Sequence, residues 1–581
     1  MKNILVLNLT RMGDIIQSTP VISGLREKYP SAKITLLVTT NFSEFVPFVP
    51  NIDDSRVLDL HQFKKTNPGQ AVTWVEIFNY LKGFMDTLKS DSFDMVVNLS
   101  HSRISALMVR YLGVRNVCGF NCNAQGDRVI HHTWMQYFAT EPFNRNYNPF
   151  NLVEIFARSG DVDPAGKIIQ LDESSITKAV TMDALHKLQL REGQLLIGIQ
   201  AGSSIEGRRW SWESFAELAE RLINSLDAKI VLLGVSAESN LAKKIMAKLL
   251  YSDNLIDLTG KTNLVQLAGV LKQCTYVVSN DTGTLHFASA LGTPVVGLYF
   301  AHAHVFETGP YYPGNLLFQS RISCAPCSYG VECNQVVCID HVSPELVANM
   351  LDHHVISGGW QVPVQHAALT EIDIFETAIG EDDRLFLKPL IRHAITVQDL
   401  FRRAYEQLWL QVLPINEGAY VCPNDFEDNL SNHFNCSGAA KVWKEAEDKI
   451  KALKRLAQYG GKGQLLTTRL IDCLRTVRTS VSQLHGLGKN IELLDTEINL
   501  IGLTHPEIKP ITDIYIRRKE NLQDVDLLQM TTETRKYYLR LREESLKLVE
   551  IIESVLLRFS RALVISVQDE TPSIKAAVPA R

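Results

Sequence analysis

The chain has 581 residues, enough for about three domains of ordinary size. With 45% apolar and 21% charged residues its composition is that of a globular protein, and its net charge of −5 gives no general attraction to nucleic acid or anionic membranes. No run of about 18 apolar residues predicts a transmembrane helix, and the N-terminus lacks the pattern of a secretory signal peptide. We therefore expect a cytoplasmic protein whose ten cysteines are mostly thiols or metal ligands.

The first part of the chain alternates between strand and helix patterns. Buried strands are predicted at Ile4 to Leu9, Lys33 to Val38 and Phe93 to Leu99, and Asp14 to Tyr29 has the periodicity of a helix with one apolar face. This alternation is typical of a parallel sheet with helices on both faces.

The alternation stops at a polar connection and then starts again. Strands are predicted at Leu195 to Gln200 and Lys229 to Leu233, and helices at Trp212 to Asn224 and Asn263 to Lys272. Two α/β units of similar size in tandem predict a ligand in the cleft between them.

The last third of the chain has a different character, almost wholly helical from Val397 onward. Long helical patterns cover Ala439 to Tyr459, Gln464 to Leu484 and Asp524 to Val567, with predicted breaks at Gly460-Gly461, Gly486 to Gly488 and His505-Pro506. We expect an all-α bundle with coiled-coil-like hairpins.

One of these helices carries a basic run: Lys441, Lys444, Lys449, Lys451, Lys454 and Arg455. Such a run usually forms a solvated face, and contact with an anionic membrane is the alternative. The helical region is also a candidate for oligomerisation or for docking a partner.

The most informative stretch is Tyr276 to Phe300, which predicts a strand, a sharp turn, a helix and a second strand. The turn carries Asp281, Thr282 and Gly283, and His286 follows near the start of the helix. Ligands of open α/β sheets bind beyond the carboxyl ends of strands, where helix N-termini offer N–H groups to anions. The motif predicts a phosphate-bearing ligand, although His286 alone is more often a packing residue.

Asp14 follows the first strand at a glycine turn. A carboxylate at that place, at the mouth of an inter-domain cleft, is suited to act as a general base. The alternative is that Asp14 only caps the following helix.

Two further strand ends carry candidate ligand-binding residues. The loop Ala201 to Trp210 joins small residues to Arg208 and Arg209, a combination that suits a diphosphate but also fits a solvated loop. Glu238 follows the next strand and can accept hydrogen bonds from ribose hydroxyls, or serve only as a first-turn glutamate.

Four cysteines lie within 15 residues, at Cys324, Cys327, Cys333 and Cys338. Tight cysteine clusters bind zinc or iron, and the alternatives are reduced thiols in a loop or disulfides formed on isolation. The other six have no ligand spacing and are predicted to be packing residues: Cys118, Cys122, Cys274, Cys422, Cys436 and Cys473.

Five pieces of the chain resemble the glycosyltransferase family 9 heptosyltransferases, in the order found in that family. They read NLTRMGDIIQSTPVISGLREKYPSAKITLLV, GIQAGSSIEGRRWSWESFAELAERL, LLGVSAES, DLTGKTNLVQLAGVLKQCTYVVSNDTGTLHFASALGTPVVGLY and CAPCSYGVECNQVVCIDHVSPELV. The resemblance extends from residue 1 to about 355, and it rests on the combination rather than on any single piece.

The resemblance implies an α/β GT-B fold of two Rossmann-like domains. Residues 1–165 would form the acceptor domain, 166–358 the nucleotide-sugar donor domain with the four cysteines, and 359–581 an all-α helical extension. It implies an inverting transfer of heptose from a nucleotide-activated donor, typically ADP-heptose, to a saccharide of the lipopolysaccharide core at the cytoplasmic face of the inner membrane. No cofactor would be needed for catalysis, and zinc or iron bound by the cysteines would be structural.

The motifs of the family can be carried over residue by residue. Asp14 falls at the position of the proposed catalytic base, Arg208 at that of the residue that neutralises the leaving diphosphate, and Glu238 at that of the ribose ligand. The donor-binding turn matches at Asp281, Thr282, Gly283 and His286.

The chain departs from the family pattern in three ways. Arg208 stands where many members have lysine, Ser211 stands where proline usually follows the tryptophan, and the region after about residue 360 has no counterpart in the usual lipopolysaccharide enzymes. Some relatives glycosylate proteins, and some of those use cysteine-bound iron and form large oligomers. The alternatives are therefore a protein O-heptosyltransferase and a non-catalytic GT-B scaffold.

Overall fold

The computed structural model describes residues 1–63, 73–140, 144–249, 253–328, 331, 333–413, 415, 433–435, 439–476, 480–522 and 525–569. These residues form two compact units. The first consists chiefly of Met1–Arg145 and Phe150–Ile391, and the second of Asn146–Pro149 and the helices after Arg392.

A five-stranded parallel sheet forms the N-terminal half of the first unit, with the order β3-β2-β1-β4-β5. Its strands are β1 (Asn3–Leu7), β2 (Lys33–Thr39), β3 (Asp54–Leu58), β4 (Met95–Asn98) and β5 (Asn116–Gly119). The helices of this half are α1 (Met12–Gln17), α2 (Thr19–Lys28), α3 (Trp74–Ser90), α4 (Arg103–Leu112), α5 (Thr133–Thr140) and α6 (Leu152–Ser159), and β6 (Asn121–Cys122) pairs with β7 (Arg128–Val129). The predicted strands here are confirmed, and they are mainly apolar because the sheet is buried on both faces.

The C-terminal half of this unit is built on an eight-stranded sheet with the order β10-β9-β8-β11-β12-β13-β14-β15. Its strands are β8 (Leu196–Gln200), β9 (Lys229–Leu233), β10 (Leu255–Asp257), β11 (Tyr276–Asn280), β12 (Val295–Tyr299), β13 (Leu316–Ser320), β14 (Ile372–Ile379) and β15 (Leu385–Pro389). Its helices are α7 (Lys178–Leu188), α8 (Trp212–Leu226), α9 (Ser239–Lys248), α10 (Leu264–Gln273), α11 (Gly283–Ala290), α12 (Val305–Thr308) and α13 (Pro344–Ser357). The two α/β halves are Rossmann-like domains, and together they have the GT-B fold.

This sheet extends further along the chain than the predicted boundary at residue 358. Strands β14 and β15 pair antiparallel to β13 and to each other, so the purely helical part begins later than the predicted residue 359. Ile372, Ile374 and Thr377 are buried, whereas Asp373 and Glu376 are only partly so. The short alternating pattern of a sheet edge is easily overlooked between two helices.

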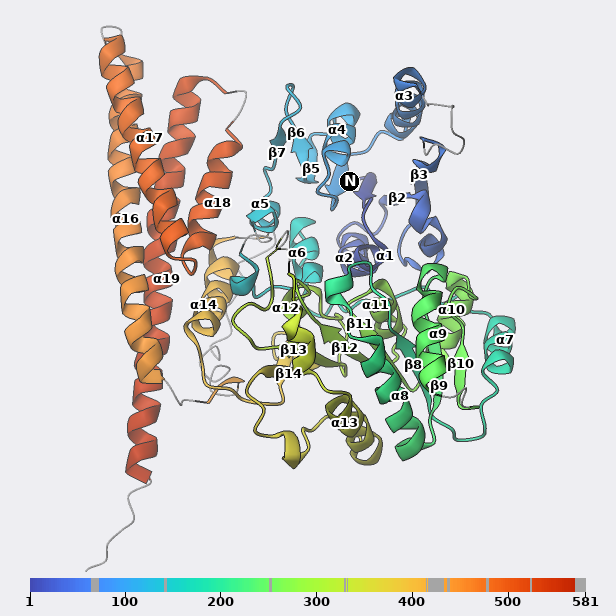
Figure 1. Ribbon diagram of the computed structural model, residues 1–581. Coiled ribbons are helices and arrows are strands. Elements are labelled where there is room, and N and C mark those ends of the chain that lie inside the picture. Colours follow the sequence, from blue (N-terminus) through green and yellow to red (C-terminus); the bar gives the residue numbers. More distant parts are fainter. Residues whose placement is uncertain are drawn as a thin grey trace, which may run out of the picture. The chain divides into compact units, whose positions relative to one another are not determined.

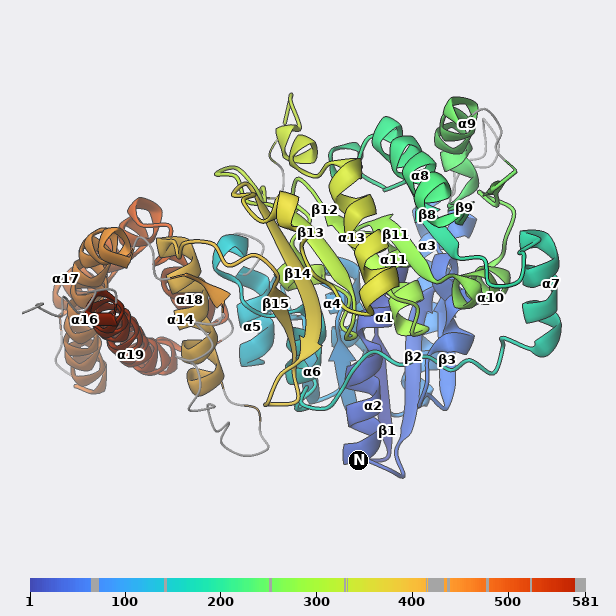
Figure 2. The ribbon, with the colours of Figure 1, turned by 90° about the horizontal axis from the view of Figure 1, so that it is seen from below.

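The second unit consists of long helices (Figures 1 and 2). They are α14 (Val397–Val412), α16 (Ala439–Arg475), α17 (Val481–Thr504), α18 (Lys509–Glu520) and α19 (Leu527–Asp569). The break predicted at His505 is confirmed, since α17 ends at Thr504. The breaks predicted at Gly460-Gly461 and at Gly486 to Gly488 are wrong, because α16 and α17 continue through them.

Two glycines of α16, Gly460 and Gly463, serve packing instead of ending the helix. α16 and α19 lie side by side (Figures 1 and 2). A Cβ atom on Gly460 would lie 2.8 Å from the carbonyl oxygen of Tyr538, and one on Gly463 would lie 2.3 Å from the ring of Tyr538. The absence of a side chain therefore lets the backbone of α16 approach α19, which compensates for the low helix propensity of glycine.

Two alanine substitutions in α16 are expected to have opposite effects on stability. Gly463→Ala forces Tyr538 to move and should lower the free energy of unfolding by about 1–3 kcal/mol. Gly461→Ala, where the new methyl group meets no atom within 4 Å, should raise it by roughly 0.5–1 kcal/mol. Thermal denaturation followed by circular dichroism measures both, and equal effects of the two variants would contradict the packing role of Gly463.

The basic run lies on α16, and most of its members have acidic partners within the second unit. Lys441 pairs with Glu445, Lys449 with Glu507, Lys451 with Asp448 and Lys454 with Glu553, at N–O distances between 2.8 and 3.8 Å. This pairing favours the interpretation as a solvated face. None of the helices in the described ranges has an apolar stretch long enough to cross a membrane.

Candidate functional site

Asp14 lies in the first turn of α1, directly after the loop that follows β1. Its Oδ2 atom accepts a hydrogen bond from the backbone N–H of Arg11 at 3.1 Å, so the capping role is real. The side chain is partly exposed, and a carboxylate that caps a helix keeps free lone pairs, which can accept further hydrogen bonds or a proton. Capping and proton transfer are therefore compatible at this residue.

The turn after β11 lies at the centre of a cluster, the β11 cluster, formed by Arg208, Asp281, Thr282, Gly283 and His286. Asp281 is buried and forms an ion pair with Arg208, which follows β8 by a short loop. Its Oδ2 atom also accepts a hydrogen bond from the Thr308 hydroxyl at 3.1 Å. Two charged groups that the sequence places 73 positions apart are thus held together, and the guanidinium of Arg208 has a fixed place at the carboxyl end of the sheet.

His286 lies on α11 and is almost fully buried. Burial lowers its pKa to about 4, with Arg208 lowering it further and Asp14 opposing the shift. The imidazole is therefore neutral at neutral pH and can donate one N–H without adding positive charge. Its Nε2 atom lies 3.7 Å from the carboxylate of Asp281, and its Nδ1 atom has no hydrogen-bond partner among the described residues.

Two glycines bring the N-terminal half of the first unit to this cluster. A Cβ atom on Gly13 would lie 3.2 Å from the His286 ring, and one on Gly283 would lie 2.7 Å from the side chain of Met12. Helices α1 and α11 therefore meet at the level of their backbones, and Asp14 lies close enough to influence His286. Thr282 stands at the start of α11, and its hydroxyl lies 3.0 Å from that of Ser279.

Glu238 lies in a pocket made by two glycines. Its Oε2 atom accepts hydrogen bonds from Gln200 Nε2 at 2.9 Å and from the backbone N–H of Val235 at 3.0 Å. A Cβ atom on Gly202 would lie 1.7 Å from Oε1, and one on Gly234 would lie 2.4 Å from Oε2. Gly234 also has a φ of +148°, which L side chains rarely adopt. The carboxylate is thus held beside the loop that carries Arg208.

Gly202→Ala is expected to displace Glu238 without unfolding the protein. The new methyl group would overlap the end of a flexible side chain, which can swing away, while the backbone is left in place. If Glu238 binds the ribose of a donor, the dissociation constant of the donor should rise about tenfold, the effect of losing one charge-assisted hydrogen bond. Isothermal titration calorimetry measures this, and Gly207→Ala, whose methyl group would have no neighbour nearer than 3.8 Å, is the matched control.

The sequence analysis did not single out several residues of the cluster. His302 follows β12, and burial together with Arg208 and Arg145 lowers its pKa to about 4. Arg145 donates to the carbonyl oxygen of His302 and forms an ion pair with Glu307 at 2.5 Å. His302 could have been found by the rule that singled out Asp281, because it also follows the end of a parallel strand.

Asn280 and His101 are two further residues that sequence reasoning missed. The side chain of Asn280 accepts a hydrogen bond from the backbone N–H of Trp210 at 2.9 Å and donates one to the carbonyl of Ala201 at 3.0 Å, so it fixes the loop that carries Arg208. His101 follows β4, and burial lowers its pKa while Asp14 opposes that shift. Asp14 therefore acts electrostatically on two histidines, from different halves of the unit.

Two of the four clustered cysteines, Cys327 and Cys338, contact the loop after β12. The backbone N–H of Ala301 donates to Cys338 Sγ at 3.4 Å, and that of Cys327 donates to the carbonyl of Ala301 at 2.8 Å. Burial raises the pKa of Cys327 and of Cys338, and the neighbouring thiols raise it further. Cys122 and Cys274 are buried, as the predicted packing role requires, and Cys118 is buried as well. Cys422 and Cys436 lie outside the described residues.

The α/β part of the chain is similar to known heptosyltransferases. Residues 82–336 match the model of glycosyltransferase family 9 (heptosyltransferase). This range includes the β11 cluster but not Asp14. Lipopolysaccharide heptosyltransferase 3 of Escherichia coli K12 is 26% identical over 301 residues, which cover 51% of this chain and 81% of that protein. Lipopolysaccharide heptosyltransferase 1 of Campylobacter coli is 25% identical over 315 residues, which cover 52% and 86%.

Among solved structures, that of E. coli ADP-heptose lps heptosyltransferase II is similar with a TM-score of 0.47 at 19% identity, covering 62% of this chain and 99% of that one. The sequence relatives match about half of this chain and more than four fifths of their own length. Residues 82–336 are therefore similar to glycosyltransferase family 9, and the protein is a glycosyltransferase.

Proposed function

We propose that the protein transfers heptose from a nucleotide-activated donor, ADP-heptose, to a saccharide of a lipopolysaccharide core. The observation that carries this proposal is the meeting of α1 and α11, which brings Asp14 near His286 and the Arg208–Asp281 pair. Both sequence relatives described above are lipopolysaccharide heptosyltransferases, and their names support the choice of sugar and acceptor.

The proposed mechanism uses one base and one cation. Asp14 would remove the proton of the acceptor hydroxyl while the bond between the anomeric carbon and the donor phosphate breaks. Arg208 would neutralise the charge that develops on the leaving diphosphate, and the N–H groups at the start of α11 would assist it. Direct displacement by the acceptor inverts the anomeric configuration and needs no covalent enzyme intermediate.

The remaining site residues would bind the donor. Glu238 would accept hydrogen bonds from the ribose hydroxyls, and Thr282 and Gly283 would line the turn that faces the phosphates. Asp281 would hold Arg208 in place, and the neutral His286 would donate a hydrogen bond to a donor oxygen. A metal held by Cys324, Cys327, Cys333 and Cys338 would be structural, because none of these steps requires it.

The acceptor has an alternative, a protein hydroxyl group. The helical unit after Arg392 supports this alternative, because about half of this chain already covers more than four fifths of each relative and the helical unit lies outside the match. Peripheral contact with the inner membrane and oligomerisation through the long helices remain further proposals.

The test is a donor screen followed by an acceptor assay. Purified protein is examined by thermal shift against ADP-, UDP- and GDP-sugars, and we expect the largest stabilisation by ADP-heptose. The selected donor is then offered with a heptose-deficient lipopolysaccharide core or with serine- and threonine-containing peptides, and the products are identified by mass spectrometry. Transfer to peptides alone would replace the saccharide acceptor by the protein acceptor, and preference for another nucleotide would refute the donor assignment.

A further inference from the structure

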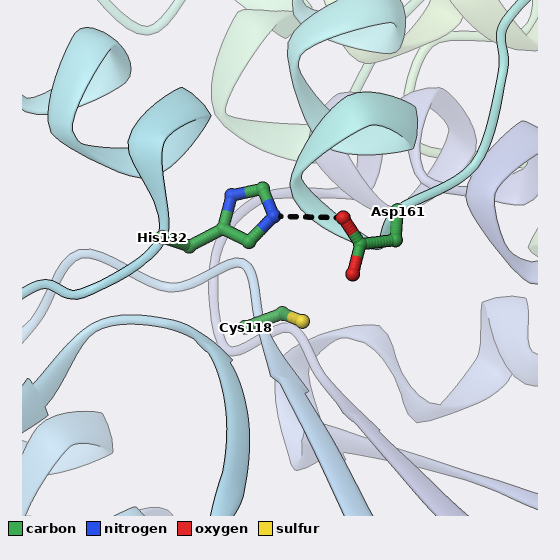
Figure 3. Close-up of side chains that lie close together, drawn as sticks. All are labelled: Cys118, His132 and Asp161. Carbon is green, nitrogen blue, oxygen red and sulfur yellow. Dashed lines mark hydrogen bonds and ion pairs between the residues drawn. The ribbon is translucent and has the colours of Figure 1, made fainter. Parts of the chain in front are cut away.

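Three side chains that the transfer chemistry does not use meet in the N-terminal half of the first unit. Cys118 lies on β5, His132 directly precedes α5, and Asp161 follows α6 (Figure 3). His132 Nε2 lies 3.2 Å from Asp161 Oδ1. One ligand atom from each of the three residues lies within 4.8 Å of the others, and no other such cluster of three is found in the described ranges.

We propose that Cys118, His132 and Asp161 form a binding site for one zinc ion. In tetrahedral zinc sites the bonds to sulfur, nitrogen and oxygen measure about 2.0–2.3 Å, which separates neighbouring ligand atoms by roughly 3.3–3.7 Å. The 3.2 Å between His132 and Asp161 already matches this spacing, and the sulfur of Cys118 has to move by about 1 Å at most. Figure 3 shows the sulfur directed toward the space below the other two groups.

The charges of the three groups favour a dication. The Cys118 thiolate and the Asp161 carboxylate would together offset the two charges of zinc, and the imidazole is a neutral ligand. The ammonium group of Lys28 donates a hydrogen bond to the main-chain oxygen of Asp161 at 3.0 Å. The two partly exposed side chains, with 13% and 16% of their surface accessible, leave room for water as the fourth ligand.

The site has a rigid backbone frame. Cys118 belongs to the paired part of β5, opposite Val97, and the carbonyl of His132 accepts the first hydrogen bond of α5 from Gln136 at 2.9 Å. Asp161 has a φ of +57°, a conformation that aspartate tolerates better than most residues. The hydrogen bond to Asp161 places the ring proton of His132 on Nε2. Nδ1 has no partner in the described part of the chain, so the proton can move to Nδ1 when a metal ion binds at Nε2. Zinc would join a strand to the ends of two helices that pack against each other.

The competing interpretation is a nucleophilic cysteine with a histidine base. It fits the geometry less well, because Nε2 of His132 faces Asp161 and Nδ1 points away from the sulfur (Figure 3). Burial and the nearby Asp161 also raise the pKa of the Cys118 thiol to about 12, so that it is protonated at neutral pH. A metal ion removes this obstacle because it displaces the thiol proton, and binding should therefore strengthen as the pH rises.

The experiment measures zinc in protein purified without a metal-affinity tag. The four clustered cysteines are first replaced by serine, Cys324→Ser, Cys327→Ser, Cys333→Ser and Cys338→Ser, to remove their contribution. After chelator treatment, reloading with Zn²⁺ and gel filtration, we expect one zinc per chain. Adding Cys118→Ser or His132→Gln should lower the content to near zero, whereas Cys274→Ser, which removes another buried thiol, should leave it unchanged. No zinc in the background protein, or equal content in all variants, would refute the site.

A second measurement covers the case in which the fourfold serine variant does not fold. The otherwise unaltered chain is loaded with Co²⁺, and its absorption spectrum is compared with that of the Cys118→Ser variant. We expect the variant to lose part of the thiolate-to-cobalt charge-transfer band, and cobalt to raise its midpoint temperature by less than that of the unaltered chain. Identical spectra and identical thermal shifts in the two proteins would overturn the proposal.

Discussion

Asp14→Asn is expected to lower the rate of sugar transfer by a factor of about 10²–10⁴ while leaving donor affinity almost unchanged. Loss of a positioned general base has an effect of this size. Asparagine keeps a side-chain oxygen that can accept the hydrogen bond from the Arg11 N–H, so α1 stays capped and the midpoint of thermal unfolding should hardly move. The measurement combines kcat with the donor dissociation constant, which separates chemistry from binding.

Glu76→Gln is the matched control for this substitution. Glu76 occupies the same third position of α3, where its carboxylate accepts a hydrogen bond from the Thr73 N–H at 2.8 Å, and it has no part in the proposed site. It should have normal transfer activity. Equal activity of the two variants would remove Asp14 from the mechanism and leave it as a helix cap.

Removal of the Arg208 charge is expected to have the second largest effect. Arg208→Met should lower kcat by about 10²–10³, because the leaving diphosphate then loses its cationic partner. Arg208→Lys, which restores a point charge at the same place, should recover most of the activity, since lysine also neutralises phosphate. Steady-state kinetics with saturating donor distinguishes the three proteins.

Loss of Arg208 also leaves Asp281 buried without its cation, so folding has to be measured in parallel. A broken buried ion pair destabilises a protein by about 3–5 kcal/mol. Arg221→Ala removes an exposed arginine that pairs with Glu217 at 2.9 Å and should change neither stability nor activity noticeably. If Arg208→Met remains folded and retains full kcat, the diphosphate is neutralised by another group.

The strand positions could be predicted from the sequence because parallel strands buried on both faces are continuous apolar runs. The candidate residues after β1, β8, β9 and β11 were found by one rule, that ligands bind beyond the carboxyl ends of such strands. That rule does not state which residues pair with each other. The ion pair between Arg208 and Asp281 depends on the adjacency of β8 and β11, which is a property of the sheet order.

The failures of sequence reasoning have physical causes as well. Strands β14 and β15 were overlooked because a half-exposed edge gives only short alternation. Gly460-Gly461 was interpreted as a helix break because glycine has a low helix propensity. The sequence does not reveal the neighbouring helix, whose packing outweighs that propensity. Cys118, His132 and Asp161 lie far apart in the sequence, and only the packing of α5 and α6 near β5 brings them together.

The contact of Gly13 and Gly283 has a consequence for how this enzyme can change during evolution. Because Gly13 and Gly283 have no side chains, the backbones of α1 and α11 approach closely, and the space left between them is filled by Met12 and His286. The surrounding loops can then vary while the spacing between Asp14 and the Arg208–Asp281 pair stays constant. A larger residue at either glycine would push α1 and α11 apart and would lower the transfer rate with every donor and acceptor alike. New specificities therefore have to arise elsewhere in the chain.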